Sequence, residues 1–135
     1  MSTIHETEIR VRYQDADGMG IVHHSKYLVF FEEARVAMTR DAGYPYRQME
    51  EDGLFFAVAK ITCQYIAPAR FEDLLRVKTT IKMLGLAKIE HLYELYRGEE
   101  LLAKGEAKLA AVDRDGKPRM IPDFFIKRYL NPSIE

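Results

Sequence analysis

The sequence lacks the features that mark several common classes of protein. One cysteine, Cys63, stands among 135 residues, which excludes an intrachain disulfide framework and fits a reducing compartment, so we expect the cytoplasm. No apolar run approaches the roughly 20 residues that span a bilayer, and the polar first residues lack a signal-peptide core, so we expect no stable membrane insertion. The net charge of −1 leaves no global basic field to attract nucleic acid.

The composition that remains is that of an ordinary globular protein. Hydrophobic residues make up 47% of the chain and charged residues 30%. A chain of 135 residues is long enough to bury a real core. We therefore expect one domain over residues 1–135.

Hydrophobic periodicity predicts one strand, then a long helix, then about four consecutive strands. Consecutive strands joined by short turns favour an antiparallel sheet, and a single long helix ahead of them favours the α+β class. Such a sheet leaves edges and part of one face free, so we expect an oligomer. The expected strands are 6–13, 54–65, 74–84, 88–96 and 101–112, and the expected helices are 25–42, 45–52 and 122–130.

An acidic, glycine-containing stretch leads into the long helix. Asp15 and Asp17 come just before Gly18 and Gly20, and the helical pattern follows. A helix start carries unpaired N–H groups and a partial positive charge, so it can hold an anion or a developing oxyanion. Asp17 is thus a candidate general base or nucleophile for acyl transfer, with a plain turn residue as the alternative. Asp15 is expected to do the structural work of the turn.

Adjacent histidines stand at the helix start, but the pattern does not indicate a metal site. His23 and His24 show neither HExxH spacing nor a cysteine partner. A calcium-loop interpretation of the acidic stretch fails because Lys26 occupies the position that needs a carboxylate. We expect no metal, with His24 near a ligand carbonyl and His23 at the surface or an interface.

Two further polar residues have competing interpretations. Ser25 could contact a ligand, but capping of the helix is the simpler role. Arg70 could bind a phosphate, or it could form a surface ion pair with Glu72 or Asp73. The sequence alone leaves both alternatives open.

Two motifs carry a resemblance to a known family. The first is Tyr13-x-Asp15-x-Asp17-x-x-Gly20-x-Val22-x-His24-x-x-Tyr27, continued by Phe31-Glu32-x-Ala34-Arg35, and the second is Tyr65-x-x-Pro68-Ala69-Arg70-x-x-Asp73. Both resemble the hotdog-fold acyl-CoA thioesterases of the 4-hydroxybenzoyl-CoA thioesterase type, including the branch associated with the bacterial Tol-Pal cluster.

The resemblance implies a fold, an assembly and a reaction. The fold would be a five-stranded antiparallel sheet wrapped around the central helix, and the assembly a homodimer or homotetramer with active sites at the dimer interface. The reaction would be hydrolysis of an acyl-CoA thioester to a free acid and coenzyme A, with no metal, no cofactor and no Ser or Cys nucleophile. The family's catalytic carboxylate falls on Asp17, and its helix-start amide and histidine fall on His24.

We therefore expect an acyl-CoA thioesterase that acts on small or medium acyl groups. An acyl carrier protein thioesterase and a non-catalytic acyl-CoA binding module are the alternatives. Asp17 and His24 are the expected catalytic residues. The expected substrate-binding residues are Gly20, Val22, His23, Ser25, Tyr27, Arg70 and Lys88.

Overall fold

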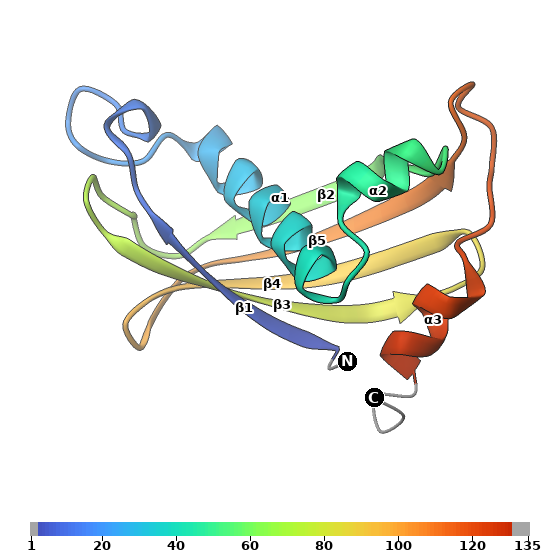
Figure 1. Cartoon of the computed structure of the whole chain (residues 1–135). Coiled ribbons are helices and arrows are strands. Elements are labelled where there is room, and N and C mark those ends of the chain that lie inside the picture. Colours follow the sequence, from blue (N-terminus) through green and yellow to red (C-terminus); the bar gives the residue numbers. More distant parts are fainter. Residues whose placement is uncertain (1–2, 131–135) are drawn as a thin grey trace.

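The computed structural model describes residues 3–130 (Figure 1). Its strands are β1 (Ile4–Arg10), β2 (Phe55–Tyr65), β3 (Leu74–Leu84), β4 (Lys88–Arg97) and β5 (Glu100–Val112). Its helices are a 3-10 turn η1 (Tyr13–Asp15), α1 (His24–Asp41), α2 (Tyr46–Glu51) and α3 (Asp123–Leu130).

The five strands form one antiparallel sheet in the order β1-β3-β4-β5-β2. The two edges are therefore β1 and β2. Figure 1 shows α1 lying across one face of this sheet, with α2 beside it. This arrangement confirms the predicted α+β class and the antiparallel sheet around a long helix.

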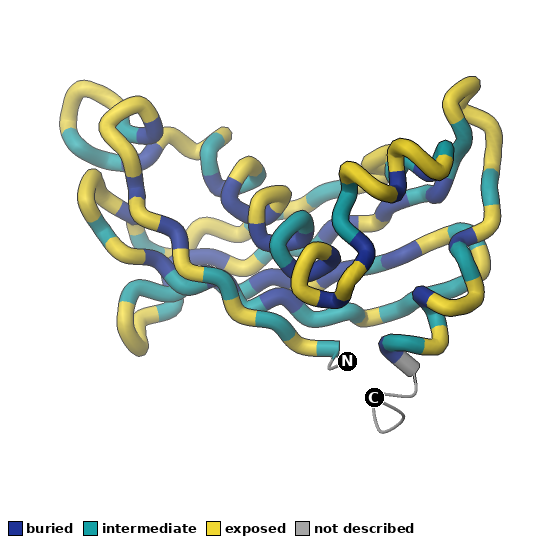
Figure 2. Tube along the Cα trace, in the orientation of Figure 1, coloured by how far each residue is buried: buried dark blue, intermediate teal, exposed yellow. Residues whose placement is uncertain are grey.

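Aromatic packing holds α1 on the sheet. Phe31 of α1 stacks on Tyr93 of β4, with ring centroids 4.6 Å apart. The same ring lies over Gly105 of β5, where an added Cβ would come within 2.9 Å of Phe31 Cδ2. A glycine is needed there because the helix approaches the strand so closely. Figure 2 shows the consequence, with α1 buried along its sheet side and exposed along the other.

A second apolar cluster closes the far end of α1. It joins the last turns of α1 to α2, to the end of β5 and to α3. Its buried members are Met38, Ala42, Tyr44, Met49, Leu54, Ala111, Ile121, Phe125 and Tyr129. This cluster packs against the C-terminal end of α1. The N-terminal end of α1 lies outside the cluster and is contacted by the loop that precedes the helix.

Most predicted boundaries lie within a few residues of the observed ones, and the differences fall at the start of the chain. The strand expected over 6–13 ends at Arg10, and Tyr13 lies in η1 with 81% of its surface exposed. Helix α1 begins at His24 and its N-cap is His23, not Ser25. The reason is local: the His23 Nδ1 accepts the Ser25 N–H at 3.2 Å, and the Ser25 hydroxyl lies 2.8 Å from the same nitrogen.

None of the helices within residues 3–130 is long and apolar enough to cross a membrane.

Candidate active site

The loop that carries Asp17 is a small β-hairpin. The Asp17 N–H donates to the Ile21 carbonyl at 2.9 Å, and the Gly20 N–H donates to the Asp17 carbonyl at 3.1 Å. Gly20 has φ +76°, a conformation that side chains other than glycine's rarely adopt. The reversal at Gly20 therefore returns the chain toward the start of α1.

The Asp17 side chain projects from this hairpin into solvent. Its Oδ1 accepts the Met19 N–H at 2.8 Å, which is the turn bond expected of an aspartate before glycine. Within residues 3–130 its second oxygen, Oδ2, has no hydrogen-bond donor. One oxygen thus holds the turn, and the other remains free for chemistry.

The hairpin is held against the segment between β2 and β3. The Val22 N–H donates to the Ala69 carbonyl and the Phe71 N–H donates to the Gly20 carbonyl, both at 2.9 Å. Ile21 and Arg70 form an isolated bridge between the two segments. The acidic stretch and the second sequence motif are therefore one structural unit.

The N–H groups at the start of α1 can be accounted for one by one. The His23 N–H donates to the Asp15 carbonyl at 3.1 Å, and the Lys26 N–H donates to the His23 carbonyl at 2.9 Å. The Ser25 N–H is taken by the His23 ring. In the described part of the chain, no acceptor is found for the His24 N–H. This N–H is the one available to an incoming oxygen.

A groove of about 320 Å³ lies beside this helix start. It is lined by Val22, His24, Tyr27, Tyr65, Ile66, Ala67 and Pro68. The Tyr65 hydroxyl donates to the His24 carbonyl at 2.8 Å, and its ring packs edge-on against Tyr27 at 4.9 Å. The Tyr27 hydroxyl accepts the Ala69 N–H at 2.9 Å. Our site prediction omitted Tyr65 and Ile66, although Tyr65 opens the second motif.

The structure brings only part of the predicted set together. Val22, His24 and Tyr27 line the groove, whereas Asp17 is absent from its lining. Lys88 lies at the opposite end of β4, since Lys88 pairs with Ala110 while Leu95 pairs with Ala103 near the groove. Lys88 therefore cannot meet the helix start within one chain.

Arg70 also differs from one of its two interpretations. Its backbone N–H donates to Asp73 Oδ2 at 2.8 Å, but the ion pair of Asp73 is made with Arg97 at 2.7 Å. Of the two alternatives for Arg70, the surface ion pair with Glu72 or Asp73 is not found within residues 3–130, and the Asp73 carboxylate is paired with Arg97 of β4 instead. The exposed Arg70 guanidinium is left for another partner.

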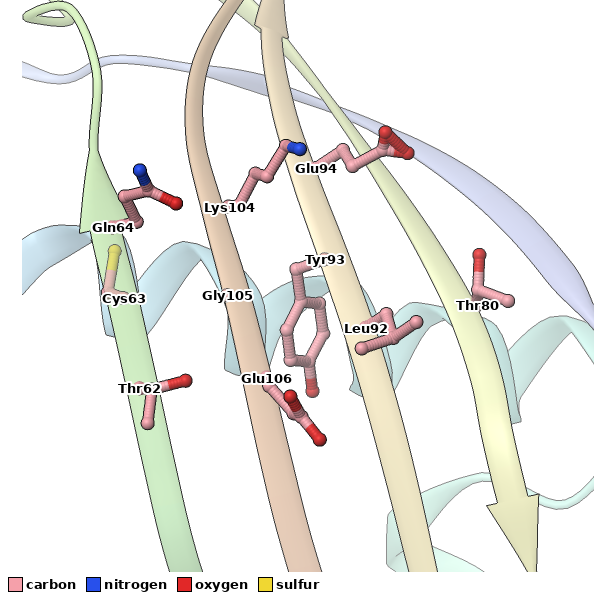
Figure 3. Close-up of a pocket in the computed structure, with 10 residues that line it drawn as sticks. All are labelled: Thr62, Cys63, Gln64, Thr80, Leu92, Tyr93, Glu94, Lys104, Gly105 and Glu106. Carbon is pink, nitrogen blue, oxygen red and sulfur yellow. The ribbon is translucent and has the colours of Figure 1, made fainter.

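A larger hollow of about 450 Å³ lies on the other face of the sheet (Figure 3). Figure 3 shows α1 behind the sheet and the side chains of Lys104, Glu94 and Glu106 in front of it. Glu106 is ion-paired with Lys82 at 3.0 Å. None of the predicted site residues lines this hollow, so its size alone does not make it the site.

The described residues contain no group of three His, Cys, Asp or Glu side chains that could hold a metal ion.

Comparison with known proteins agrees with this geometry. The Acyl-CoA thioester hydrolase YbgC of Escherichia coli is 30% identical over 130 residues, which cover 95% of this chain and 97% of that protein. The acyl-CoA thioesterase YbgC of Haemophilus influenzae is 36% identical over 106 residues, 78% of each chain. The crystal structure of a probable thioesterase from Bartonella henselae superposes with a TM-score of 0.84 at 32% identity, covering 88% of this chain and 99% of that one.

A family-level comparison agrees with these pairwise similarities. The profile of the thioesterase-like superfamily matches residues 11–129, a span that includes the hairpin, α1, the groove and the whole of β2 to β5. The chain belongs to the thioesterase-like superfamily and has its hotdog fold.

Proposed function

We propose that this protein is an acyl-CoA thioesterase that hydrolyses small or medium acyl-CoA thioesters to a free acid and coenzyme A. The observation that carries the proposal is the unpaired His24 N–H at the end of an apolar groove. Such an N–H, backed by the positive end of α1, stabilises the negative charge that develops on a thioester carbonyl oxygen. The names of the bacterial relatives support acyl-CoA as the substrate class.

The reaction needs one carboxylate and one oxyanion donor. With the carbonyl oxygen at the His24 N–H, Asp17 either removes a proton from the attacking water or attacks the carbonyl carbon itself. In both routes the carbon–sulfur bond breaks and coenzyme A leaves as a thiol after protonation. On the direct route, water then hydrolyses the acyl-aspartate anhydride and restores the carboxylate.

The remaining predicted residues take supporting roles in this proposal. Val22 and Tyr27 form the wall of the acyl groove, and His24 adds its ring to the groove. Gly20, His23 and Ser25 shape the hairpin and the helix start. Arg70, whose guanidinium has no ion pair within residues 3–130, contacts the phosphates of coenzyme A. Lys88 acts only from a second protomer.

Because Asp17 does not line the groove of its own chain, we propose that two chains complete the site. Strand β2 is a sheet edge, and its outer backbone groups are unpaired in one chain. Val58 is 51% exposed, Tyr65 47% and Ile66 50%, which is costly for apolar surface left in water. Pairing of two β2 edges would bury this surface, and two such dimers would give the tetramer.

Replacing Val58 by glutamate should disrupt this association. A charge on the paired edge opposes close approach of a second strand. Light scattering coupled to size-exclusion chromatography should show the variant at the mass of one chain, where the native protein runs as a dimer or tetramer. Leu86→Glu is the matched control, since Leu86 is 66% exposed but lies away from β2. Monomeric native protein would contradict the proposal.

A substrate panel tests the activity itself. Purified protein is mixed with short, medium, long and aromatic acyl-CoA thioesters, and thiol release is followed. Turnover of the short and medium members is expected. The same acyl groups on acyl carrier protein separate the two carriers by kcat/KM. Calorimetric binding of acyl-CoA with no thiol release would instead favour a non-catalytic binding module. For either function we propose a location in the cytoplasm.

A further inference from the structure

A buried carboxylate, paired with an exposed arginine, lies directly before the hairpin that carries Asp17. Asp15 is 1% exposed, although it is charged. Its Oδ1 lies 3.1 Å from Arg12 Nη2, and its Oδ2 accepts the Arg12 backbone N–H at 2.9 Å and the Arg12 Nε–H at 3.3 Å. A buried carboxylate is tolerated when it is paired and hydrogen-bonded in this way.

The ionised state of Asp15 is maintained by these contacts. Burial by itself raises the pKa of the Asp15 carboxyl, but the hydrogen bonds and the charge of Arg12 outweigh it, so the pKa lies below its usual range. The side chain therefore remains a carboxylate at any pH at which the enzyme would work. It acts as a fixed anchor rather than as a proton carrier.

The main chain of Asp15 extends this anchor to the helix. Its carbonyl accepts the N–H of His23, the N-cap of α1, at 3.1 Å. The hairpin of residues 16–22 is thus closed at both ends. Asp15 precedes it, His23 follows it, and the hydrogen bond between these two residues joins its ends. The same bond occupies the His23 N–H and leaves the next N–H, that of His24, as the free donor.

We propose that Asp15 is a positioning residue that holds the hairpin carrying the Asp17 carboxylate in a fixed position relative to the start of α1. This inference rests on the proposed function and adds a role that the catalytic residues do not themselves provide. Loss of the anchor should misplace the hairpin while the groove keeps its lining, because within residues 3–130 the Asp15 side chain is hydrogen-bonded to Arg12 and to none of the residues that line the groove. The defect should appear in kcat and not in KM.

The test compares Asp15→Ala and Asp15→Asn with the native protein. Asp15→Ala should lower kcat by about 100-fold, as expected for misplacement of a reacting group by about 1 Å, while KM changes by less than about threefold. Asp15→Asn retains an oxygen for the Arg12 N–H, so it should recover part of the loss. The control is Asp113→Asn, which alters a turn carboxylate that accepts the N–H groups of Asp115 and Lys117 at 2.9 and 3.0 Å.

Hydrogen exchange supplies a second readout that does not depend on activity. In Asp15→Ala the hydrogen-bonded amides of the hairpin should exchange about tenfold faster or more, while those of β4 and β5 keep their protection. These amides are those of Asp17, Met19, Gly20, Val22 and His23. If Asp15→Ala does not fold, the same comparison is made with Asp15→Asn. If the native protein is inactive on every thioester, the proposed function is wrong. Hydrogen exchange would still test whether Asp15 holds the hairpin in place. Unchanged exchange of the hairpin, or unchanged kcat in an active background, overturns the inference.

Discussion

Asp17→Asn should lower kcat for acyl-CoA hydrolysis by about 10³-fold, the scale of losing a general base or a carboxylate nucleophile. Asparagine has the size and shape of aspartate, and its side-chain oxygen can still accept the Met19 N–H that Asp17 Oδ1 accepts at 2.8 Å. The hairpin should therefore keep its form. What is lost is the negative charge and the free oxygen. Thiol release under saturating substrate measures the effect, and the circular dichroism spectrum and melting temperature should remain native.

A matched control separates this chemical loss from a turn effect. Asp115 is, like Asp17, an exposed aspartate that precedes a glycine, Gly116, but it lies in the turn after β5. Asp115→Asn should leave kcat within about twofold, because it changes a surface turn away from the helix start. Full activity in Asp17→Asn would show that the carboxylate takes no part in the reaction. If the variant loses activity as expected, single-turnover trapping of an acyl-enzyme in the native protein distinguishes the nucleophilic role of Asp17 from the general-base role.

His91→Phe should remove a large part of the sensitivity of the fold to acid. His91 is 3% exposed on the helix side of β4, and its ring stacks over Tyr93 at 5.9 Å. Burial, together with the nearby charge of Arg35, lowers the pKa of His91 to about 3. Its Nδ1 has no hydrogen-bond partner within residues 3–130. The folded state thus keeps this imidazole neutral.

The direction of the effect follows from proton uptake on unfolding. In the unfolded chain His91 binds a proton below its ordinary pKa of 6.5. In the folded chain it binds that proton only near pH 3. Stability therefore falls as the pH drops through this window, by up to about 1.4 kcal/mol per pH unit for one proton. Phenylalanine keeps the ring stack but binds no proton. Urea unfolding at pH 7, 6, 5 and 4 should give a shallower pH dependence for the variant.

Two further variants guard this interpretation. His91→Leu serves if phenylalanine overfills the site, since it also removes the titrating ring. Tyr93→Phe is the control, because it removes the hydroxyl that accepts the Arg35 Nη1–H at 3.2 Å while leaving His91 in place. It should lower stability at every pH and keep the native slope. Equal slopes in His91→Phe and the native protein would show that His91 is not the source of the acid sensitivity.

Local sequence signals were sufficient for the elements and for the position of the acidic, glycine-containing turn before α1. Alternating residues predicted β3 over 74–84 with both ends correct, and the long helix predicted to end at Ala42 ends at Asp41, with Ala42 as its C-cap. Turn chemistry likewise predicted the structural role of Asp15, which the ion pair with Arg12 confirms. Each of these features depends on neighbours within a few residues, so the one-dimensional pattern contains the necessary information.

Capping and pairing were predicted less well where two groups compete for one partner. His23 caps α1 in place of Ser25 because its ring accepts the Ser25 N–H. Arg97 takes the Asp73 carboxylate, which was one of two alternative partners considered for Arg70. Sequence spacing ranks such candidates by type and distance along the chain. It contains no measure of which side chain a distant strand brings closer.

The order of residues alone determined the α+β class, the acidic, glycine-containing turn and the helix that follows it. Only the folded chain decided that His24 is the residue whose N–H stays free, that Tyr65 and Ile66 join the groove, and that Lys88 lies at the other end of the sheet. The physical reason is that a hydrogen-bond donor is free or occupied according to contacts between segments as far apart as residues 15, 23 and 69. Those contacts exist once the strands are in register, and periodicity along the chain does not encode them.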